Sequence, residues 1–287
     1  MALVDSLQKA LEYMEDKMLE DITIEDISQH AHLSPFHFQR TFTILMDISV
    51  AEYLRRRRLT LAAKEVCSSD IKVIVLAFKY GYDTPESFSK SFKRQHHVNP
   101  SEMRKGLGKI QSYHRLTIQV SLKGEKPMKY KVIEKEAFQV VGIKREYSLI
   151  DNENLIEIPK FWQEVHQDGT HDSLIQLNKG TIQGVMGVCV DGSDKYSNRI
   201  EYWIATEVEV DTSYTNLLSL SIPASKWAVF EVHGPMPNAM QEGWKQIYSE
   251  WLPSNKYEFA DLPELEVYLN EVPNNEVLYS EIWIPIK

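Results

Sequence analysis

The sequence predicts an all-α domain followed by an α+β domain. Three observations support this prediction. A segment of about thirty residues occurs twice, fifty residues apart, and its apolar positions follow helical spacing. After about residue 128, short runs of alternating apolar and polar residues, typical of β-strands, are interrupted by two helical stretches. A length of 287 residues also suits two hydrophobic cores better than one.

The repeated segment spans residues 24–53 and 74–103, and each copy reads as helix, short turn, helix. The second helix of each copy opens with a hydroxyl residue and a proline, which are favourable at the N-cap and at the first helical position. Two phenylalanines follow with four-residue spacing, so they share a face and are predicted to be buried. The pattern predicts two helix-turn-helix motifs. The residues concerned are Ser34-Pro35, Phe38 and Phe42 in the first copy and Thr84-Pro85, Phe88 and Phe92 in the second.

The outward faces of the two second helices differ, although their buried faces are alike. Arginine and glutamine can address guanine and adenine edges in the major groove, and lysine and arginine can neutralise phosphates. Two similar scaffolds with different polar faces predict two readers of two DNA segments, with a merely solvated face as the alternative. The predicted DNA-facing residues are Phe36, Gln39, Arg40 and Thr43 in the first helix and Glu86, Ser87, Lys90, Lys93 and Arg94 in the second.

Between the two copies, residues 50–68 combine strong helix formers with an apolar stripe and predict one connecting helix. A helix of about 19 residues is about 28 Å long, which is comparable with one turn of DNA at about 34 Å. Such a connector could hold both readers against successive major-groove segments. Arg55 to Arg58 point all round this helix. One or two of them, Arg58 included, are predicted to contact phosphate, and the others to be solvated or paired with acids.

Charge is distributed unevenly along the chain, whose formal net charge is −9. Residues 40–109 hold fourteen Lys/Arg against seven Asp/Glu, whereas residues 113–287 hold 16 Lys/Arg against 26 Asp/Glu. An excess of positive charge in one segment is typical of a module that faces nucleic acid. The alternative is two ordinary domains with uneven surface charge.

A resemblance to the AraC/XylS family of transcription regulators covers about residues 4–108. It rests on three stretches, SPFHFQRTF, YLRRRRLTLAAKEV and IKVIVLAFKYGYDTPESFSKSFKRQHHVNPSEMR. The resemblance implies a DNA-binding unit of two helix-turn-helix motifs joined by a long helix, with double-stranded DNA and RNA polymerase as partners. It also implies base-reading positions at Phe36, Gln39 and Arg40 in the first recognition helix and at Glu86, Ser87 and Lys90 in the second.

The second domain is predicted to begin at residue 128. Glycines and a proline punctuate the chain around residues 109–127, which is typical of a linker. The DNA-binding domain is therefore expected to span residues 1–108 and the following domain residues 128–287. The latter falls into two halves of similar layout, each with a strand, a helix and further strands. Strands with helices between them predict an α+β domain whose helices cover one sheet face.

Side-chain parity along the predicted strands separates two kinds of face. In residues 200–207, 264–269 and 277–284, one side is mainly aliphatic and suits packing under helices, and the other mixes carboxylates with aromatic rings. A surface of the second kind suits a flat, lipophilic small molecule, neutral or cationic, held by ring stacking, cation–π attraction and a desolvated carboxylate. The alternative is that the aromatics fill a small core and the acids meet solvent. The residues assigned to this surface are Tyr147, Trp203, Trp227, Tyr268, Tyr279, Glu281 and Trp283.

The second half also resembles the GyrI-like effector-binding domain, through the stretches KWAVFEVHGPM, EWLP, LPELEVYL and YSEIWIPI. That family is built from two β-α-β-β repeats, and the resemblance implies that Glu266 lines a ligand cleft. The two resemblances together imply a transcription activator controlled by a small-molecule effector. Two alternatives stay open: a hydrolase acting on a small electrophile, with Glu266 and Tyr279 as its catalytic pair, and a protein-binding module.

The sequence offers no catalytic, metal or cofactor motif. It contains no phosphate-cradling glycine loop and no serine in a nucleophile elbow, and His30, His32 and His37 lack the spacing of a zinc site. We therefore expect a regulator without a cofactor rather than an enzyme. Two cysteines far apart in sequence and no apolar run of about 20 residues predict a cytoplasmic protein without a membrane partner.

Overall fold

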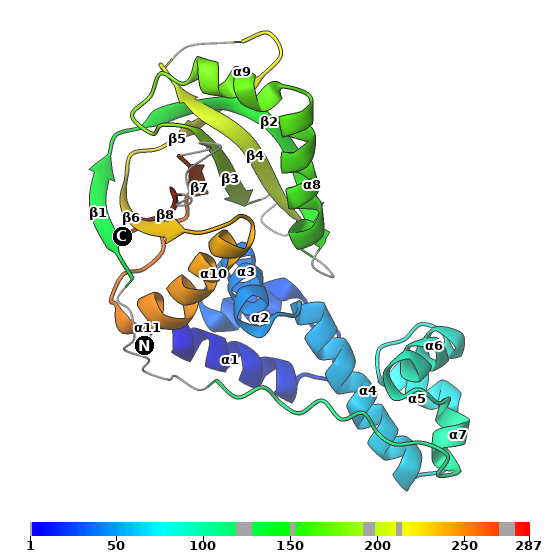
Figure 1. The fold of residues 1–287 in the computed structure, drawn as a ribbon. Coiled ribbons are helices and arrows are strands. Elements are labelled where there is room, and N and C mark those ends of the chain that lie inside the picture. The colour runs from blue at the N-terminus through cyan, green and yellow to red at the C-terminus, as the bar shows by residue number, and fades with distance from the viewer. Residues whose placement is uncertain (1, 119–127, 150–152, 192–198, 211–213, 270–278) are drawn as a thin grey trace. The chain divides into compact units, whose positions relative to one another are not determined.

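The computed structural model of the chain describes residues 2–118, 128–149, 153–191, 199–210, 214–269 and 279–287. It contains two compact units, one formed mainly by residues 4–42 and 48–119 and the other mainly by residues 120–287. We call them the helical unit and the sheet unit (Figure 1). The predicted fold class, an all-α domain followed by an α+β domain, is confirmed.

The helical unit has its helices where the repeat predicts them. α3 and α6 begin at Pro35 and Pro85, the residues predicted to open the two second helices. At α6, the Thr84 side chain accepts a hydrogen bond from the backbone N–H of Ser87 and caps the helix. The connecting helix α4 has 19 residues, in agreement with the expected length. The described helices are α1 (Ala2–Asp16), α2 (Ile24–Ala31), α3 (Pro35–Met46), α4 (Val50–Ser68), α5 (Val73–Lys79), α6 (Pro85–His96) and α7 (Pro100–Arg104).

Both phenylalanine pairs are buried, as their spacing predicts. Phe38 and Phe42 are 0% and 1% exposed, and Phe88 and Phe92 are both 0% exposed. The second pair packs with Leu59 and its neighbours on α4 in one apolar cluster. Burying one phenylalanine stabilises a fold by about 1.5–3 kcal/mol, so each pair is a major anchor of its recognition helix.

The sheet unit is built on one antiparallel sheet of eight strands in the order β1-β6-β8-β7-β3-β4-β2-β5. Two similar runs, β2-α8-α9-β3-β4 and β6-α10-β7-β8, follow one another along the chain and meet where β3 pairs with β7. The strands are β1 (Tyr130–Lys135), β2 (Phe138–Ser148), β3 (Val185–Asp191), β4 (Arg199–Val208), β5 (Leu218–Ile222), β6 (Ser225–His233), β7 (Glu264–Tyr268) and β8 (Tyr279–Ile286). The helices are α8 (Glu153–Gln167), α9 (Thr170–Leu177), α10 (Asn238–Gln246), the π-helical turn η2 (Ile247–Trp251) and α11 (Leu252–Ser254).

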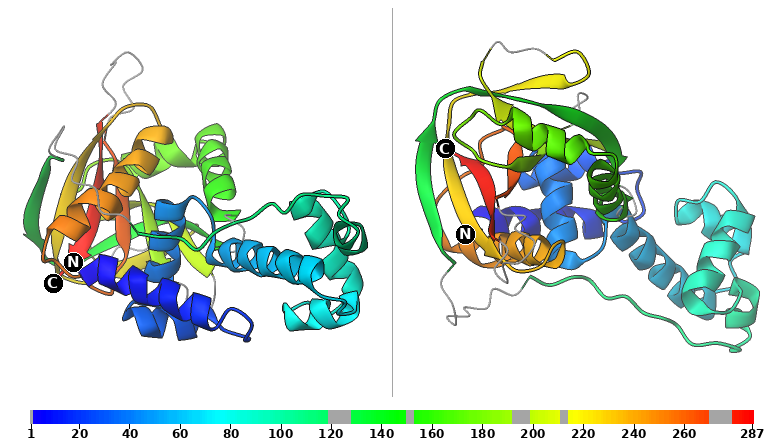
Figure 2. Two further views of the ribbon diagram at one scale, coloured as in Figure 1. Left: turned by 90° about the horizontal axis from the view of Figure 1, so that it is seen from below. Right: turned by 45° about the horizontal axis from the view of Figure 1, so that its top comes forward.

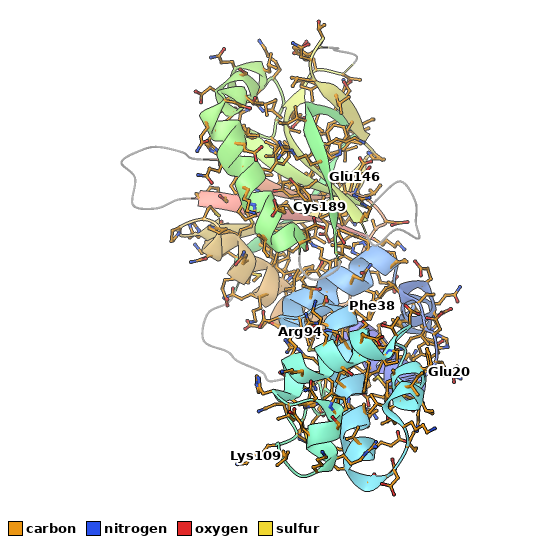
Figure 3. The ribbon with its side chains drawn as sticks, turned by 90° about the vertical axis from the view of Figure 1, so that its right-hand side faces the viewer. Glu20, Phe38, Arg94, Lys109, Glu146 and Cys189 are labelled. Carbon is orange, nitrogen blue, oxygen red and sulfur yellow. The ribbon has the colours of Figure 1, made fainter. Side chains whose placement is uncertain are left out.

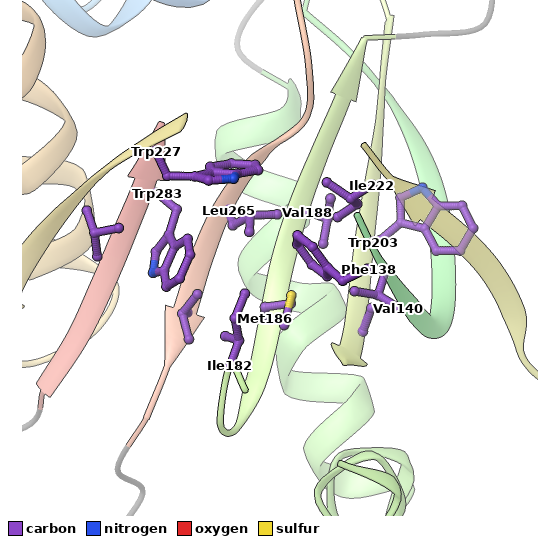
Figure 4. Packing of buried hydrophobic residues seen from close by; sticks show 13 residues of the cluster. Phe138, Val140, Ile182, Met186, Val188, Trp203, Ile222, Trp227, Leu265 and Trp283 are labelled. Carbon is purple, nitrogen blue, oxygen red and sulfur yellow. The ribbon is translucent and has the colours of Figure 1, made fainter. Parts of the chain in front are cut away.

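The sheet curls strongly, so that one of its faces becomes an inner surface (Figure 2). Four strands separate β6 from β2, which would place them roughly 24 Å apart in a flat sheet. The rings of Phe138 on β2 and Trp227 on β6 are nevertheless only 6.4 Å apart. Side chains from the inner face fill the curl with an apolar core that includes Trp203, Trp227 and Trp283 (Figure 4).

The outer face of the curled sheet is covered by helices. α8 packs on β2, α9 on β4 and β3, and α10 on β6 and β8. Helices on one face confirm the α+β prediction, but the inner face is buried as well, which the strand patterns did not reveal. Among the described residues, no helix is long and apolar enough to cross a membrane.

Candidate functional site

Glu266 lies at the centre of a polar cluster on the helix-covered face of the sheet. It is a β7 residue and is only 9% exposed. Its Oε2 accepts hydrogen bonds from the hydroxyl of Tyr202 at 2.9 Å and from that of Tyr268 at 3.2 Å. Its Oε1 accepts one from the indole Nε1 of Trp244 at 2.8 Å. A carboxylate is therefore held under the helices by a ring of aromatic donors.

The two helices that cover this site each contribute a tryptophan. Trp244 of α10 reaches Glu266 directly. Trp162 of α8 donates from its Nε1 to the Tyr202 hydroxyl oxygen at 2.9 Å, and its ring packs edge-on to that of Tyr268 at 4.7 Å. The carboxylate is thus connected to both α8 and α10 through side chains that combine an apolar ring with one polar group.

Gly187 makes this arrangement possible. It lies on β3 directly opposite Glu266 in the pairing of the two strands. A Cβ at residue 187 would lie 2.0 Å from the hydroxyl oxygen of Tyr202 and 3.2 Å from Oε2 of Glu266. The absence of a side chain therefore lets the Tyr202 phenol reach across β3 to the carboxylate.

Both tyrosines in the site remain neutral hydrogen-bond donors. Burial raises the pKa of Tyr202 well above its usual value, and the charge of Glu266 raises it further. The same two causes, in the same order, raise the pKa of Tyr268. The site therefore presents negative charge surrounded by neutral aromatic groups, which is the chemistry that attracts a lipophilic cation.

The eight residues predicted to line one ligand surface lie on two opposite faces of the sheet. Glu266 and Tyr268 share the helix-covered face, and Tyr147 lies on that face too, 6.5 Å between ring centres from Phe161 of α8. The remaining five residues belong to the inner face, so the prediction of a single surface is wrong. Those five are Trp203, Trp227, Tyr279, Glu281 and Trp283.

Glu281 has its own partners on the inner face, where Tyr279 and Trp283 share its side of β8. It accepts hydrogen bonds from the hydroxyl of Tyr279 at 2.8 Å, from Nε1 of Trp283 at 2.7 Å and from Nζ of Lys131 at 3.3 Å. Tyr279 thus pairs with Glu281, and the hypothetical catalytic pair of Glu266 and Tyr279 is not assembled. The pairing of Leu265 with Trp283 explains the error, because it puts the apolar side of β7 on the inner face.

The second recognition helix displays the residues that the sequence predicts to face DNA. On α6, the side chains of Glu86, Ser87, Lys90, Lys93 and Arg94 are all exposed. Figure 3 labels Arg94 on α6 and Phe38 on α3. The exposed cations on this helix suit phosphate or base-edge contacts.

The first recognition helix differs from the prediction. Phe36 and Gln39 on α3 are 4% and 6% exposed, and Arg40 and Thr43 are half-buried. The guanidinium of Arg40 lies over the Phe36 ring, 5.9 Å from its centre. A large aromatic side chain favours burial, so its presence at residue 36 argues against a fully solvated face. The role of these residues in reading bases stays a prediction.

The four consecutive arginines of α4 make contacts within the helical unit. Arg55 and Arg56 both pair with Glu52, and Arg57 pairs with Glu15. Arg58, predicted to contact phosphate, instead donates to the backbone carbonyls of Met18 at 2.8 Å and Glu20 at 2.9 Å. Burial lowers the pKa of Arg58. Because its donors tie α4 to the turn that follows α1, this arginine supports the fold rather than extending towards a duplex.

Comparison with known families assigns both units. The family described as integron-associated effector binding protein matches residues 131–286, more than half of the chain, and the helix-turn-helix domain family matches residues 27–106. The chain belongs to the integron-associated effector-binding protein family. Its helical unit is an AraC-type DNA-binding domain, and its sheet unit is a GyrI-like effector-binding domain. It is therefore an effector-controlled, DNA-binding transcription regulator.

Curated relatives match the helical unit of this effector-binding protein, and AarP and MarA are among them. It is 35% identical over 95 residues to the HTH-type transcriptional activator AarP of Providencia stuartii, covering 33% of this chain and 70% of AarP. It is 26% identical over 99 residues to the multiple antibiotic resistance protein MarA of Salmonella typhimurium, covering 34% of this chain and 78% of MarA. AarP is, by its description, a transcriptional activator with a helix-turn-helix domain.

A solved structure matches the sheet unit of this effector-binding protein. It is described as SAV2435 bound to tetraphenylphosphonium, and it shares 26% identity with a TM-score of 0.50. The match covers 56% of this chain and 94% of that one. The similarity supports the GyrI-like fold of the sheet unit.

Sequence reasoning missed three residues of the effector-binding protein's central site. Tyr202 lies on the side of its strand that parity predicts to be aliphatic, and neither Trp162 nor Trp244 is among the predicted site residues. The two tryptophans do carry a signal, because each is followed by an aliphatic residue three positions later, in the stretches FWQEV and GWKQI of the two repeats. Among the described residues, no group of three or more His, Cys, Asp or Glu could hold a metal ion.

Proposed function

We propose that this regulator senses a lipophilic organic cation at Glu266. The observation that carries the proposal is the buried carboxylate and its three aromatic donors, Tyr202, Tyr268 and Trp244. A desolvated cation over aromatic rings gains about 2 kcal/mol, and a carboxylate at the same place neutralises its charge. The similarity to a protein solved with tetraphenylphosphonium, a lipophilic cation, supports the same class of effector here.

The effector must displace side chains to reach the carboxylate. Tyr202 and Trp244 are 1% and 4% exposed, so the aromatic groups fill the space around Glu266. A cation that replaces their hydrogen bonds would move Trp162 and Trp244, and with them α8 and α10. Ligand binding can regulate only if the effector binds one state of the protein more tightly than the other.

We infer that the helical unit binds two adjacent major-groove segments of one DNA duplex. α3 would present the half-buried Arg40 and Thr43, and α6 would present the exposed Lys90 and Arg94. The length of α4, about 28 Å at 19 residues, is compatible with successive groove segments on one side of a duplex. By its similarity to an activator, the protein would promote transcription in the cytoplasm through contact with RNA polymerase.

Tetraphenylphosphonium tests the effector site directly. Titration of the full-length protein with this cation, followed by tryptophan fluorescence, should show saturable quenching, because Trp244 donates to Glu266 and Trp162 donates to its partner Tyr202. Glu266→Gln removes the charge and keeps the shape, so it should weaken binding at least tenfold, as loss of a desolvated ion pair would.

Glu281→Gln is the matched control. Glu281 is similarly buried, at 6% exposed, and accepts similar phenol and indole hydrogen bonds, but on the inner face. It should bind tetraphenylphosphonium as tightly as the wild type. Equal binding by Glu266→Gln and the wild type, or a loss confined to Glu281→Gln, would overturn the proposal.

A further inference from the structure

The chain that follows α7 lies along the helical unit instead of leaving it. Residues 110–116, which we call the strap, fall within the linker that the sequence predicts over residues 109–127. In the structure they run back along α4 (Figure 1). Ile110 packs on the apolar cluster around Phe88, Phe92 and α4. The strap therefore begins within the core of the second helix-turn-helix motif.

Three backbone N–H groups hold the strap. The N–H of Gln111 donates to Nδ1 of His96 at 3.1 Å, and that of Tyr113 donates to Oγ1 of Thr60 at 3.1 Å. The N–H of Leu116 donates to the hydroxyl of Tyr53 at 3.4 Å. The strap thus passes from the end of α6 along α4 towards the N-terminus of that helix.

Backbone carbonyls and one ring complete the contact. The carbonyl of Tyr113 accepts from Nη1 of Arg57 at 2.7 Å, and that of Gln111 accepts from Nε2 of Gln95 at 3.3 Å. The guanidinium of Arg56 lies 4.8 Å from the centre of the Tyr113 ring. Residues 53, 57 and 60 lie on one stripe of α4, so the strap follows a single face of that helix.

His96 and Gln95 connect the strap to the second recognition helix. His96 is 2% exposed, and its Nε2 lies 3.1 Å from the carbonyl of Leu59 on α4, while its Nδ1 receives the Gln111 N–H. Gln95 donates to the carbonyl of Arg56 at 3.2 Å as well as to the strap. The last turn of α6 is therefore bound to α4 and to the strap through the same two side chains.

We propose that the strap positions α6 against α4 and thereby sets the separation of the two DNA-reading helices. The inference rests on the proposed DNA-reading function of α3 and α6. Strap residues would act through α6 and would not themselves touch DNA. Because the strap continues towards the sheet unit in sequence, it is also the covalent route by which that unit can act on α6.

Proline scanning of the full-length protein tests the proposal. Gln111→Pro/Tyr113→Pro deletes two of the three N–H donors and keeps the extended backbone. The matched control, Ser112→Pro/His114→Pro, adds the same two prolines at the alternate positions, whose N–H groups are not among the three described. The probe is a duplex selected by the wild-type chain from a random-sequence pool. Its half-sites are mapped by hydroxyl-radical protection, and the one that loses protection in Lys90→Ala/Arg94→Ala is assigned to α6.

The test variant should bind this duplex about tenfold more weakly, because it loses the bond from the strap to His96 of α6, the bond to Thr60 of α4 and the Tyr113 ring over Arg56. It should lose protection over the α6 half-site and keep it over the α3 half-site, a split that general unfolding would not produce. The control should match the wild type. Tyr113→Phe, which keeps the ring over Arg56, should also match it, whereas Tyr113→Ala should weaken the α6 half-site.

Unchanged affinity and protection in the test variant would overturn the proposal, and so would equal loss over both half-sites or an equal loss in the control. Failure of the wild-type chain to select or protect any duplex would instead overturn the proposed reading of DNA by α3 and α6. The two failures are therefore distinguishable.

Discussion

At the scale of single residues, the most informative position is one without a side chain. Gly187 leaves the space through which the Tyr202 hydroxyl reaches Glu266. A carboxylate that is 9% exposed needs donors to offset the loss of water, and this glycine admits one of them. The chemistry of the site therefore depends on a residue that makes no polar contact through a side chain of its own.

Gly187→Ala should damage the site through overpacking. The added methyl group would lie 2.0 Å from the Tyr202 hydroxyl oxygen, so the phenol must move. We expect a loss of about 1–3 kcal/mol in the free energy of unfolding and weaker binding of tetraphenylphosphonium. Urea denaturation and fluorescence titration measure the two effects. In a Tyr202→Leu background the added cost of Gly187→Ala should shrink, and full additivity of the two substitutions would contradict the explanation.

His96 should make stability depend on pH. Burial lowers the pKa of His96, the bond to the Leu59 carbonyl acts in the opposite direction, and the nearby His97 lowers it further. The folded state thus favours neutral His96. The contribution of neutral His96 to the free energy of unfolding is complete above the unfolded pKa of about 6.5. It is lost as the pH falls through the lower pKa of the folded state, because the unfolded chain takes up the proton first.

Urea denaturation between pH 7.5 and 5 measures this loss. His96→Leu should flatten the pH dependence over that range. His97→Asn is the control and should keep most of the pH dependence, because His97 is the smallest of the three causes acting on the pKa of His96. Asparagine also tolerates the left-handed backbone of residue 97, at φ 64°. A pH profile that survives in His96→Leu and disappears in His97→Asn would show that the wrong histidine was assigned.

At the scale of elements, the sequence predicts helices more completely than strand faces. The recognition helices begin at the predicted prolines, and the connector has its predicted length. Parity fails for the sheet because the helices cover one face and the curl buries the other, so apolar alternation has no solvent side to identify. Glu266 and Glu281 both look like acids on an exposed side, yet each is buried on a different face.

The strap could not be predicted from its side chains for a related reason. Residues 111–115 are all exposed, and backbone groups make most of the contacts. A pattern of apolar and polar letters contains no information about which N–H groups find an acceptor. The acceptors, His96, Thr60 and Tyr53, are brought to the strap by the helix packing alone.

The link between α1 and α4 provides a prediction at this scale. Glu15 accepts from Arg57 at 2.6 and 2.7 Å and from the Tyr53 hydroxyl at 2.6 Å. Burial alone would raise the pKa of Glu15, but the bonds from Arg57 and Tyr53 outweigh it and lower the pKa. Glu15→Gln should therefore reduce the free energy of unfolding by about 2 kcal/mol at neutral pH.

Glu20→Gln is the matched control for Glu15→Gln. Glu20 forms an exposed pair with Lys17, whose side chain is 42% exposed against 60% for Glu20, and such pairs contribute about 0–1 kcal/mol. Urea denaturation of both variants decides the comparison. Equal effects would mean that the link between Glu15, Tyr53 and Arg57 does not stabilise the helical unit.

At the scale of the whole molecule, the division of charge predicts how DNA binding responds to salt. The logarithm of the association constant should fall linearly with the logarithm of salt concentration, because cations of the helical unit replace counterions on phosphate. Lys90→Ala and Arg94→Ala should each reduce the slope by about one. Lys129→Ala removes an exposed cation of the sheet unit and should leave the slope unchanged. A slope insensitive to Lys90 and Arg94 would place α6 away from the duplex.

The meeting of the two repeats at β3 and β7 has a consequence for stoichiometry. The strands face each other across the junction, but Glu266 on one is matched by Gly187 on the other. The backbone is thus duplicated, but the buried carboxylate of Glu266 on β7 has no counterpart at the paired position on β3. Each chain should accordingly saturate with a single equivalent of cation along a hyperbolic isotherm, although its architecture is double.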